Sequence, residues 1–234
     1  MSSAAPIPLS APANAALIEQ INAALPQTQC TRCGYPDCRA YAEAIASGDA
    51  PINRCPPGGA EGIERLATLT RQPVLPLDPD CGSEGPRLMA IIDEAWCIGC
   101  TLCLDACPVD SILGAHKRMH TVIEPLCTGC ELCVPVCPVD CIRLEPITGE
   151  RTGWAAWSTG QAEEARVRYA AHQTRAVRLQ QEHDTRLEAK AAAKLADLPA
   201  HSQHTDPAVL DRKRAVIEAA LARARARKAG DGTA

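Results

Sequence analysis

The chain has 234 residues but no phenylalanine, and it contains only three tryptophans and three tyrosines. Because large aromatic side chains contribute much of the buried area of ordinary cores, something other than a conventional core has to supply part of its cohesion. No apolar stretch approaches the roughly 20 residues that a transmembrane helix requires, and no signal peptide is visible. We therefore expect a chain that does not span a membrane by itself and that works in a reducing compartment.

Further absences exclude other classes of function. No glycine-rich phosphate loop or flavin-binding motif is evident, so we expect no nucleotide site. The formal net charge of -4 and the few aromatic side chains disfavour a nucleic-acid-binding protein, despite basic stretches at 212–214 and 223–228. We interpret these stretches as a solvated helical face, with docking onto an acidic protein or a membrane surface as the alternative. Residues 1–154 carry 10 basic and 18 acidic side chains, which predicts an acidic surface in that part.

Cysteine, in contrast, is abundant, with 14 residues. Eight of them form two runs of the pattern Cys-x-x-Cys-x-x-Cys-x-x-x-Cys-Pro, namely Cys97, Cys100, Cys103 and Cys107, then Cys127, Cys130, Cys133 and Cys137. This spacing is typical of proteins that hold two [4Fe-4S] clusters. Zinc knuckles use cysteine pairs separated by a longer gap, and a disulfide framework is not expected in a reducing compartment. The pattern therefore predicts reversible one-electron chemistry.

The two runs form an internal repeat with an offset of 30 residues, and residues 97–110 agree with residues 127–140 at 9 of 14 positions. In two-cluster ferredoxins the fourth cysteine of each run binds the cluster of the other run. We therefore predict two crossed ligand sets. The Cys97 group consists of Cys97, Cys100, Cys103 and Cys137, and the Cys107 group consists of Cys107, Cys127, Cys130 and Cys133. Apolar residues between these cysteines are expected to wrap the clusters and to exclude water.

Another set of cysteines precedes the runs. The Cys30 group consists of Cys30, Cys33, Cys38 and Cys55. Glycine and proline between the second and third of these cysteines suit a tight turn, and the Pro-Pro-Gly-Gly sequence after the fourth lets backbone pass close to a bulky inorganic core. The spacing fits a single [4Fe-4S] cluster, although a structural zinc site also takes four cysteines.

The segment Cys-Thr-Arg-Cys-Gly-Tyr-Pro-Asp-Cys-Arg-Ala-Tyr-Ala-Glu-Ala-Ile from Cys30, and Ile-Asn-Arg-Cys-Pro-Pro-Gly-Gly around Cys55, resemble the four-cysteine iron-sulfur domain of the B subunit of Rnf/Rsx electron transport complexes. The order of this domain and the double ferredoxin unit also matches, so the resemblance covers about residues 15–150. It implies that the Cys30 group holds a third [4Fe-4S] cluster, which makes three in all. In that family the complexes sit in the bacterial inner membrane and couple electron flow between ferredoxin and NAD to ion movement.

The resemblance implies an iron-sulfur protein that relays single electrons as the B subunit of an Rnf-type ion-translocating complex. Typical family members begin with a hydrophobic anchor helix, whereas this chain begins with a polar segment rich in alanine and proline. A soluble cytosolic polyferredoxin that serves other reductases is therefore the alternative. We expect an electron carrier without catalytic residues, with ferredoxin or Rnf-type subunits as partners and no nucleic acid. Membrane association is expected only through partners, which places the chain in the cytoplasm, free or peripheral on the cytoplasmic face of the bacterial inner membrane.

The expected fold is α+β: a small helical four-cysteine domain, a two-cluster ferredoxin-like domain of short β-hairpins and helices, and a C-terminal helical extension. Composition and apolar spacing predict helices at 15–25, 39–47, 62–70 and 208–228, a long helix from 158 to about 198, and strands at 88–93, 121–123 and 142–144. The expected segments are a disordered lead-in at 1–14, the four-cysteine domain at 15–70, a semi-rigid Pro-rich linker at 71–87, the ferredoxin domain at 88–154 and a partly flexible extension at 155–234.

Four other residues receive structural interpretations. Cys141 stands where the first run has Ser111, so we expect a buried structural thiol. Cys81 lies in the Pro-rich linker, and its sequence context does not decide whether it is reactive. His116 and His120 are interpreted as solvated side chains of the connection between the runs rather than as metal ligands.

Overall fold

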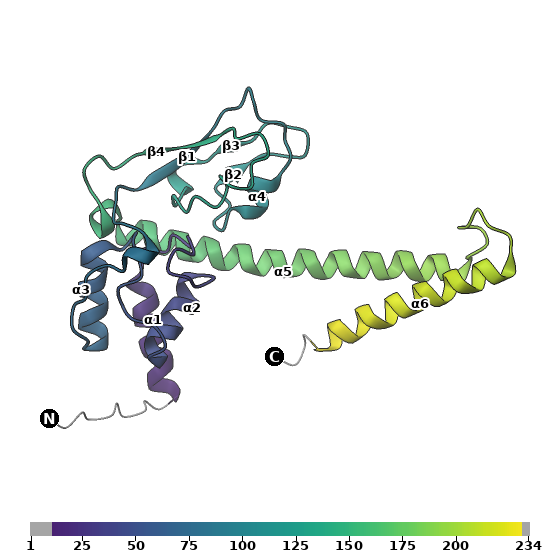
Figure 1. Ribbon diagram of the computed structural model, residues 1–234, viewed down its shortest axis with the longest axis horizontal. Coiled ribbons are helices and arrows are strands. Elements are labelled where there is room, and N and C mark those ends of the chain that lie inside the picture. Colours follow the sequence, from purple (N-terminus) through teal and green to yellow (C-terminus); the bar gives the residue numbers. More distant parts are fainter. Residues whose placement is uncertain (1–10, 231–234) are drawn as a thin grey trace. The chain divides into compact units, whose positions relative to one another are not determined.

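The computed structural model describes residues 11–230 and confirms the α+β class, with six α-helices and two two-stranded sheets in the described part. The chain divides into one unit that ends at His172 and a second that begins at Gln173. Figure 1 shows short helices and the small sheets in the first unit and long helices toward the C-terminus. Most of the expected lead-in at 1–14 lies outside the described residues, and the first helix already starts at Ala11.

The N-terminal module of the first unit consists of three helices, α1 (Ala11–Ala23), α2 (Cys38–Ser47) and α3 (Gly59–Thr70). The side chain of Asp37 accepts a hydrogen bond from the Ala40 amide (2.7 Å) and caps the start of α2. Gly48 ends this helix in the left-handed conformation (φ 84°), as expected. The apolar faces of the helices enclose a core in which Tyr41 is almost fully buried, and its hydroxyl donates to the Pro51 carbonyl (2.9 Å).

The stretch 71–87 is more packed than the semi-rigid linker that we expected. It contains the 3-10 helix η1 (Pro79–Cys81). The carboxylate of Glu84 accepts hydrogen bonds from the Ala60 amide (2.8 Å) and the Thr152 hydroxyl (2.6 Å). One acidic side chain of the stretch therefore joins the N-terminal module to the segment that follows the strands.

Two antiparallel strand pairs form the next part of the first unit. β1 (Leu88–Ile92) pairs with β4 (Ile142–Pro146), and β2 (Ile112–Leu113) pairs with β3 (Thr121–Val122). In the first pair, Leu88 lies opposite Pro146 and Ile92 opposite Ile142. Because β1 precedes the first cysteine run and β4 follows the second, this pair joins the two ends of the repeat. β1, β3 and β4 lie at positions that the apolar segments predict, whereas β2 was not predicted.

The repeat extends to the backbone conformation. Three pairs of equivalent residues have positive φ: Gly99 and Gly129 (69° and 67°), Thr101 and Glu131 (70° and 66°), and Asp110 and Asp140 (50° and 49°). A Cβ atom at Gly99 would collide with the backbone of Arg118, and one at Gly129 with the Leu88 carbonyl oxygen. Because glycine lacks this atom, each run can make its tight turn between the first two cysteines.

Short helices complete this part, namely α4 (Leu102–Ala106), η2 (Glu124–Leu126) and η3 (Gly153–Ala156). Trp154 in η3 packs against the N-terminal module. Its Nε1 donates to the Ala24 carbonyl (3.0 Å), and the Arg65 guanidinium lies 4.0 Å from the ring centroid. Truncation of a buried tryptophan typically costs about 3–5 kcal/mol, so this side chain contributes strongly to the contact between the module and the segment that follows β4.

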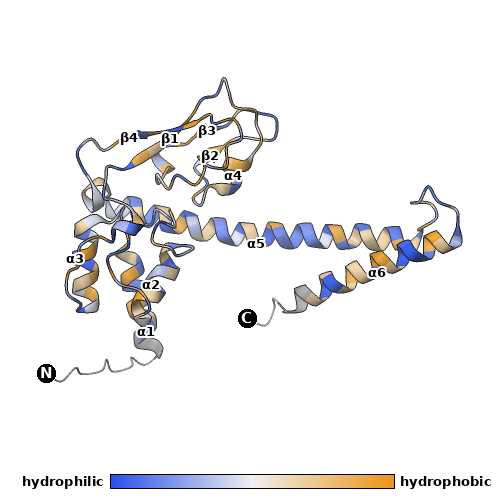
Figure 2. Ribbon diagram, viewed as in Figure 1, coloured by the Kyte–Doolittle hydropathy of each residue, from blue (hydrophilic) through white to orange (hydrophobic). Residues whose placement is uncertain are grey.

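Two long helices end the described chain, α5 (Thr159–Ala196) and α6 (Pro207–Gly230), as expected. The first turns of α5 belong to the first unit, where Ala162 and Ala165 are buried. Figure 2 shows that the rest of α5 is largely hydrophilic, and in the second unit Leu198 and Leu221 are the apolar residues buried among the described ones. No helix within residues 11–230 combines the length and the apolar character that crossing a bilayer requires.

Candidate iron-sulfur centres

Cys137 of the second run lies close enough to Cys103 of the first run for its charge to act on that thiol. Burial, and then the charges of Cys100, Cys97 and Cys137, raise the pKa of Cys103 to about 11. Burial also raises the pKa of Cys137 itself, but backbone and side-chain hydrogen bonds, including those from Cys141, lower it more, and the pKa lies below its ordinary value. The other three thiols of the Cys97 group therefore act on Cys103, although one of them comes from the other run.

The Cys107 group shows the reciprocal arrangement. One cavity is lined by all four of its cysteines, together with Ser111 and Gly129. Burial is the largest cause that raises the pKa of Cys130 to about 12, and the charges of Cys107 and Cys127 add to it. Burial and the charges of its three companions raise the pKa of Cys133 to about 12 as well. The fourth cysteine of the first run thus lies with the first three of the second.

The Cys30 group lies between the helices of the N-terminal module. Cys38 is the first residue of α2, and Cys55 precedes α3. Burial raises the pKa of both thiols, and the charges of Cys30 and Cys33 raise it further. Cys81 of η1 is also buried, and its charge acts on Cys33. The Pro-rich stretch therefore places a fifth thiol beside this group.

The donor set of these groups fits a [4Fe-4S] core. Thiolates that are buried together repel one another and lack water, so their charge is costly unless a metal core compensates it. Thiolate is the donor that iron-sulfur clusters take. Within residues 11–230, no three or more His, Cys, Asp or Glu side chains are placed to hold a single metal ion. A cube spreads its ligands over four iron atoms, so these ligands lie farther apart than those of one ion.

Equivalent residues of the repeat donate hydrogen bonds to the fourth cysteine of each run. The Ser111 amide donates to Cys107 Sγ (3.2 Å), and the Ser111 hydroxyl lies 3.2 Å from the same sulfur. In the other half the Cys141 amide donates to Cys137 Sγ (3.4 Å), and the two sulfurs are 3.5 Å apart. Hydrogen bonds to sulfur are one of the factors that set the reduction potential of a cluster. Cys141 is half-buried rather than buried as expected, and it contacts a predicted ligand.

His120 does not match its sequence interpretation. His116 is exposed, as expected, but His120 is buried with 1% of its surface exposed. Its Nδ1 lies 3.2 Å from Cys103 Sγ, and its amide donates to Cys97 Sγ (3.4 Å). The interpretation of His120 as solvated is therefore wrong. The physical reason is that Gly114 has no Cβ, which leaves room for the imidazole ring between the runs.

The ligand loop of the Cys30 group touches the ligand loop of the second run. Arg32, which lies between Cys30 and Cys33, forms an ion pair with Glu131. The Thr128 hydroxyl donates to the Thr28 carbonyl (3.1 Å). No sequence signal identified these contacts, because they join positions that are about a hundred residues apart.

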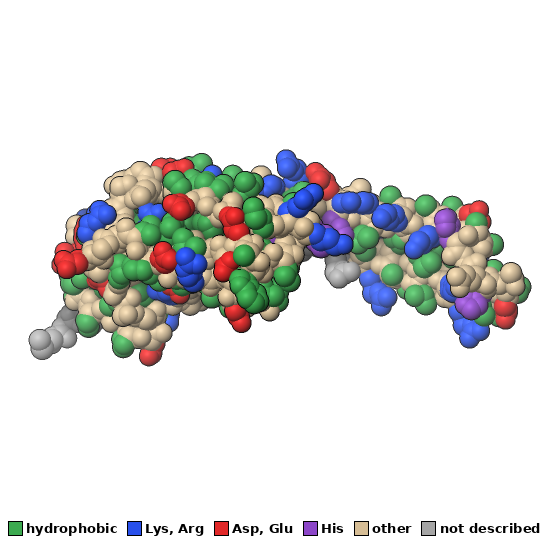
Figure 3. Space-filling model, turned by 90° about the horizontal axis from the view of Figure 1, so that it is seen from above, with side chains coloured by type: hydrophobic (Ala, Val, Ile, Leu, Met, Phe, Trp, Pro, Cys, Tyr) green, Lys and Arg blue, Asp and Glu red, His purple; other side chains and the backbone are tan. Residues whose placement is uncertain are grey.

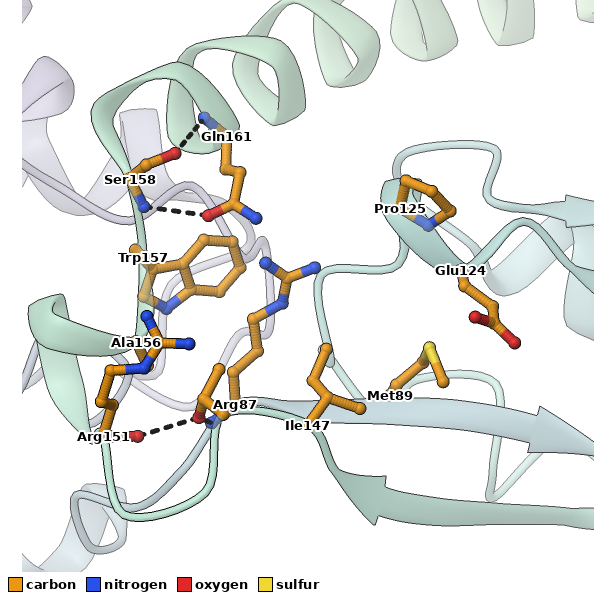
Figure 4. A pocket seen from close by; sticks show the side chains of 11 residues that line it. Arg87, Met89, Glu124, Pro125, Ile147, Arg151, Ala156, Trp157, Ser158 and Gln161 are labelled. Carbon is orange, nitrogen blue, oxygen red and sulfur yellow. Dashed lines mark hydrogen bonds between the residues drawn. The ribbon is translucent and has the colours of Figure 1, made fainter.

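Arg87 makes further contacts that the sequence did not indicate. It lines a pocket together with Trp157, Gln161, and residues of β1, of η2 and of the stretch that follows β4 (Figure 4). Its guanidinium lies 4.6 Å from the Trp157 ring centroid, and Nη2 donates to the Cys127 carbonyl (2.9 Å). A buried cation therefore contacts a predicted cluster ligand of the second run.

The acidic excess of the first unit does not form one continuous patch on the face that Figure 3 shows. Acidic side chains are scattered there among exposed apolar ones. Trp96, Ile98, Leu113 and Met119 are among the exposed apolar residues, each with more than half of its surface accessible. These residues lie within or near the first cysteine run and the connection that follows it.

Two protein families match the chain in the segments that carry these cysteines. The family described as "4Fe-4S dicluster domain" matches residues 90–144. The family described as "Putative Fe-S cluster" matches residues 25–57. No solved structure matches the chain.

Similar proteins cover both segments. The B subunit of the ion-translocating oxidoreductase complex of Azoarcus sp. (strain BH72) is 59% identical over 138 residues, which are 59% of this chain and 75% of the relative. The protein of that name from Alkalilimnicola ehrlichii is 55% identical over 152 residues, or 64% of this chain and 81% of the relative. The chain belongs to the family of B subunits of ion-translocating oxidoreductase complexes. As a member of this family it is an iron-sulfur protein with an electron-transfer role, and its clusters are of the [4Fe-4S] type.

The match to the B-subunit family is not equally long in all relatives. The protein of the same name from Thiobacillus denitrificans is 60% identical over 107 residues, which are 46% of this chain and 57% of the relative. The aligned lengths are shorter than the chain in each of these three cases, so part of this chain lies outside the similarity that defines the family.

Proposed function

We propose that this member of the B-subunit family carries three [4Fe-4S] clusters and relays single electrons between partner proteins. The Cys30, Cys97 and Cys107 groups, as defined above, are the proposed ligand sets, and they lie in the segments 15–70 and 88–154 that we expected to be separate domains. The observation that best supports the proposal is the cavity lined by all four cysteines of the Cys107 group, together with the finding that none of the twelve proposed ligands is exposed. The crossed membership of Cys107 and Cys137 supports the two-cluster ligand pattern.

The residues around each group provide what such a cofactor needs from a protein. When bound, a [4Fe-4S] cluster supplies reversible one-electron chemistry. Val109 and Ile112 are buried beside the Cys107 group and exclude water, which is a factor that sets reduction potential. Amides such as those of Ser111 and Cys141 stabilise thiolate charge by donating to sulfur. The chain thus holds, dehydrates and hydrogen-bonds the proposed ligands without offering a catalytic side chain.

We further propose that the chain works as the B subunit of an ion-translocating oxidoreductase complex. The names of its relatives and their 55–60% identity support this assembly. Its partners are then redox subunits of the complex or ferredoxin, and no nucleic acid is involved. Membrane association runs through these partners, on the cytoplasmic face of the bacterial inner membrane.

Metal analysis of the full chain, purified without oxygen, tests the number of clusters. We expect about 12 iron and about 12 sulfide per chain, from three clusters of four, and reversible EPR signals during stepwise reduction. Cys81→Ser and Cys141→Ser are matched controls that keep the iron content, because neither thiol belongs to a proposed ligand set. About 8 iron atoms would mean that one of the three groups holds no cluster and would count against the Cys30 group. A zinc-loaded protein that cannot be reduced would contradict the proposed function altogether.

Isolation from native membranes tests the assembly. The tagged full chain, extracted in mild detergent, is expected to recover membrane-bound redox subunits in fixed proportion. Recovery with soluble reductases alone, with all of the chain in the soluble fraction, would contradict the complex and support the soluble polyferredoxin.

A further inference from the structure

Arg87 is held in one place by both its backbone and its side chain. Its amide donates to the Thr148 hydroxyl (3.0 Å), and its carbonyl accepts from the Ile147 amide (3.0 Å). The guanidinium stacks on Trp157 and donates through Nη2 to the Cys127 carbonyl, and Figure 4 shows it extending between the indole ring and η2. Only 8% of the residue is exposed. The positive charge therefore has a fixed distance to the Cys107 group.

The charge of Arg87 is poorly compensated by its surroundings. Burial lowers its pKa, and the charge of Cys127 raises it by a smaller amount. The guanidinium still keeps its proton at neutral pH, because the ordinary pKa of arginine lies above about 12. Within the described residues, Nε has no hydrogen-bond partner. A buried cation of this kind interacts more strongly with nearby charge than an exposed one does.

We propose that Arg87 raises the reduction potential of the cluster at the Cys107 group above that of the cluster at the Cys97 group. The inference rests on the proposed function. Reduction adds negative charge to a ligated core, and a fixed nearby cation favours the reduced form. At the Cys97 group, the side chains that contact the sulfurs of predicted ligands are those of His120 and Cys141, and neither is an arginine. The charges that act on Cys103 there are those of its companion thiols.

Redox titration of variants tests this assignment. Arg87→Met removes the charge and keeps a long flexible side chain, and Arg87→Lys keeps the charge. Arg143→Met is the matched control, because Arg143 is an exposed cation on β4. The full chain is loaded without oxygen and reduced stepwise, and EPR follows each cluster. We expect Arg87→Met to lower the equilibrium constant for reduction of one cluster at least about tenfold, which is about 59 mV for one electron.

The other variants distinguish an effect of the positive charge of Arg87 from an effect of a changed structure. Arg87→Lys is expected to recover most of the shift, and Arg143→Met to produce none. The shifted cluster should persist in a Cys100→Ala background, where the Cys97 group lacks a ligand. Unchanged potentials in Arg87→Met, equal shifts of every cluster, or a shifted component that disappears with Cys100→Ala would each overturn the inference.

A second measurement applies if Arg87→Met does not retain its iron. Native protein and Cys100→Ala are then compared, and the Cys100→Ala variant should lose the lower-potential signal of the two ferredoxin-like clusters. Loss of the higher-potential signal would overturn the role of Arg87. Iron-free or redox-silent native protein would instead contradict the proposed function, so the two failures are distinguishable.

Discussion

The two cysteine runs have the same spacing and the same left-handed backbone positions, but their surroundings differ. The first run is open, since Trp96 is 70% and Ile98 58% exposed. The second run is covered, because Arg32 contacts it from the N-terminal module and Arg87 contacts it from beside β1. The repeated residues therefore determine which cofactor can be held, and the residues outside the repeat make the two sites different.

Removal of the fourth cysteine of either run gives the largest expected effect, because each of them is proposed to bind the cluster of the other run. Cys137→Ala should abolish the cluster at the first run, although this residue belongs to the second run, and Cys107→Ala should abolish the cluster at the second. Each change removes about 4 of about 12 iron atoms. Metal analysis measures the loss, and EPR shows which cluster is missing.

The EPR signal whose potential shifts in Arg87→Met is assigned to the cluster at the Cys107 group, and it shows which cluster each of these two variants retains. It should persist in Cys137→Ala and be absent in Cys107→Ala. If each variant instead lost the cluster of its own run, the crossed ligand sets would be wrong.

Gly99 and Gly129 are equivalent in the repeat, but replacing each by alanine should lower the stability of the protein by different amounts. Both positions have a left-handed backbone, which costs alanine roughly 1–2 kcal/mol. At Gly129 the added Cβ meets the Leu88 carbonyl of the paired strand β1, whereas at Gly99 it meets the connection near Arg118, which lies outside the strands. We therefore expect Gly129→Ala to be the more destabilising by about 1–3 kcal/mol.

The temperature at which the visible absorbance of the clusters disappears measures this difference. Gly149→Ala is the control, because Gly149 has φ 59° and no atom within 4 Å of its added Cβ. It should show the backbone cost alone. Equal midpoints for Gly99→Ala and Gly129→Ala would mean that β1 yields as readily as the connection.

Loss of the imidazole in His120→Leu should lower the reduction potential of the cluster at the Cys97 group only. With the proton on Nδ1, the ring donates to Cys103 Sγ across 3.2 Å. One such bond is worth about 1 kcal/mol, which is about 40 mV for a one-electron couple. Redox titration checks the shift, and His116→Leu is the control, because His116 is exposed in the same connection. A shift at the Cys107 group would contradict the contact.

The comparison also shows how far sequence can predict this molecule. Cysteine spacing and apolar segments predict the two-cluster class, the strands near Leu88 and Ile142, and the cap at Gly48, because each depends on residues close in sequence or on alternation within one element. His120 and Arg87 escaped prediction because their roles depend on packing between distant segments. No local pattern indicates that His120, four residues after the exposed His116, is buried. The same holds for Arg87, which ends the Pro-rich stretch.

The smallest expected effect concerns the position where the repeat differs by one atom. Ser111 offers a hydroxyl to Cys107, and Cys141 offers a thiol to Cys137. A hydroxyl is the stronger donor, so Cys141→Ser should raise the potential of the cluster at the Cys97 group by about 0.5 kcal/mol, or about 20 mV. Ser111→Cys should lower the potential at the Cys107 group by a similar amount.

Redox titration of both single variants and of the double exchange measures these opposite shifts. Iron content should stay constant in all three, because neither position belongs to a proposed ligand set. Shifts of the same sign would show that the hydrogen bond is not the cause. Loss of about 4 iron atoms in Cys141→Ser would show that Cys141, and not Cys137, is the fourth ligand of the first run. This outcome matters because the two sulfurs are only 3.5 Å apart. The cysteine spacing assigns Cys137 as the ligand and Cys141 as its neighbour, and the iron content tests that assignment directly.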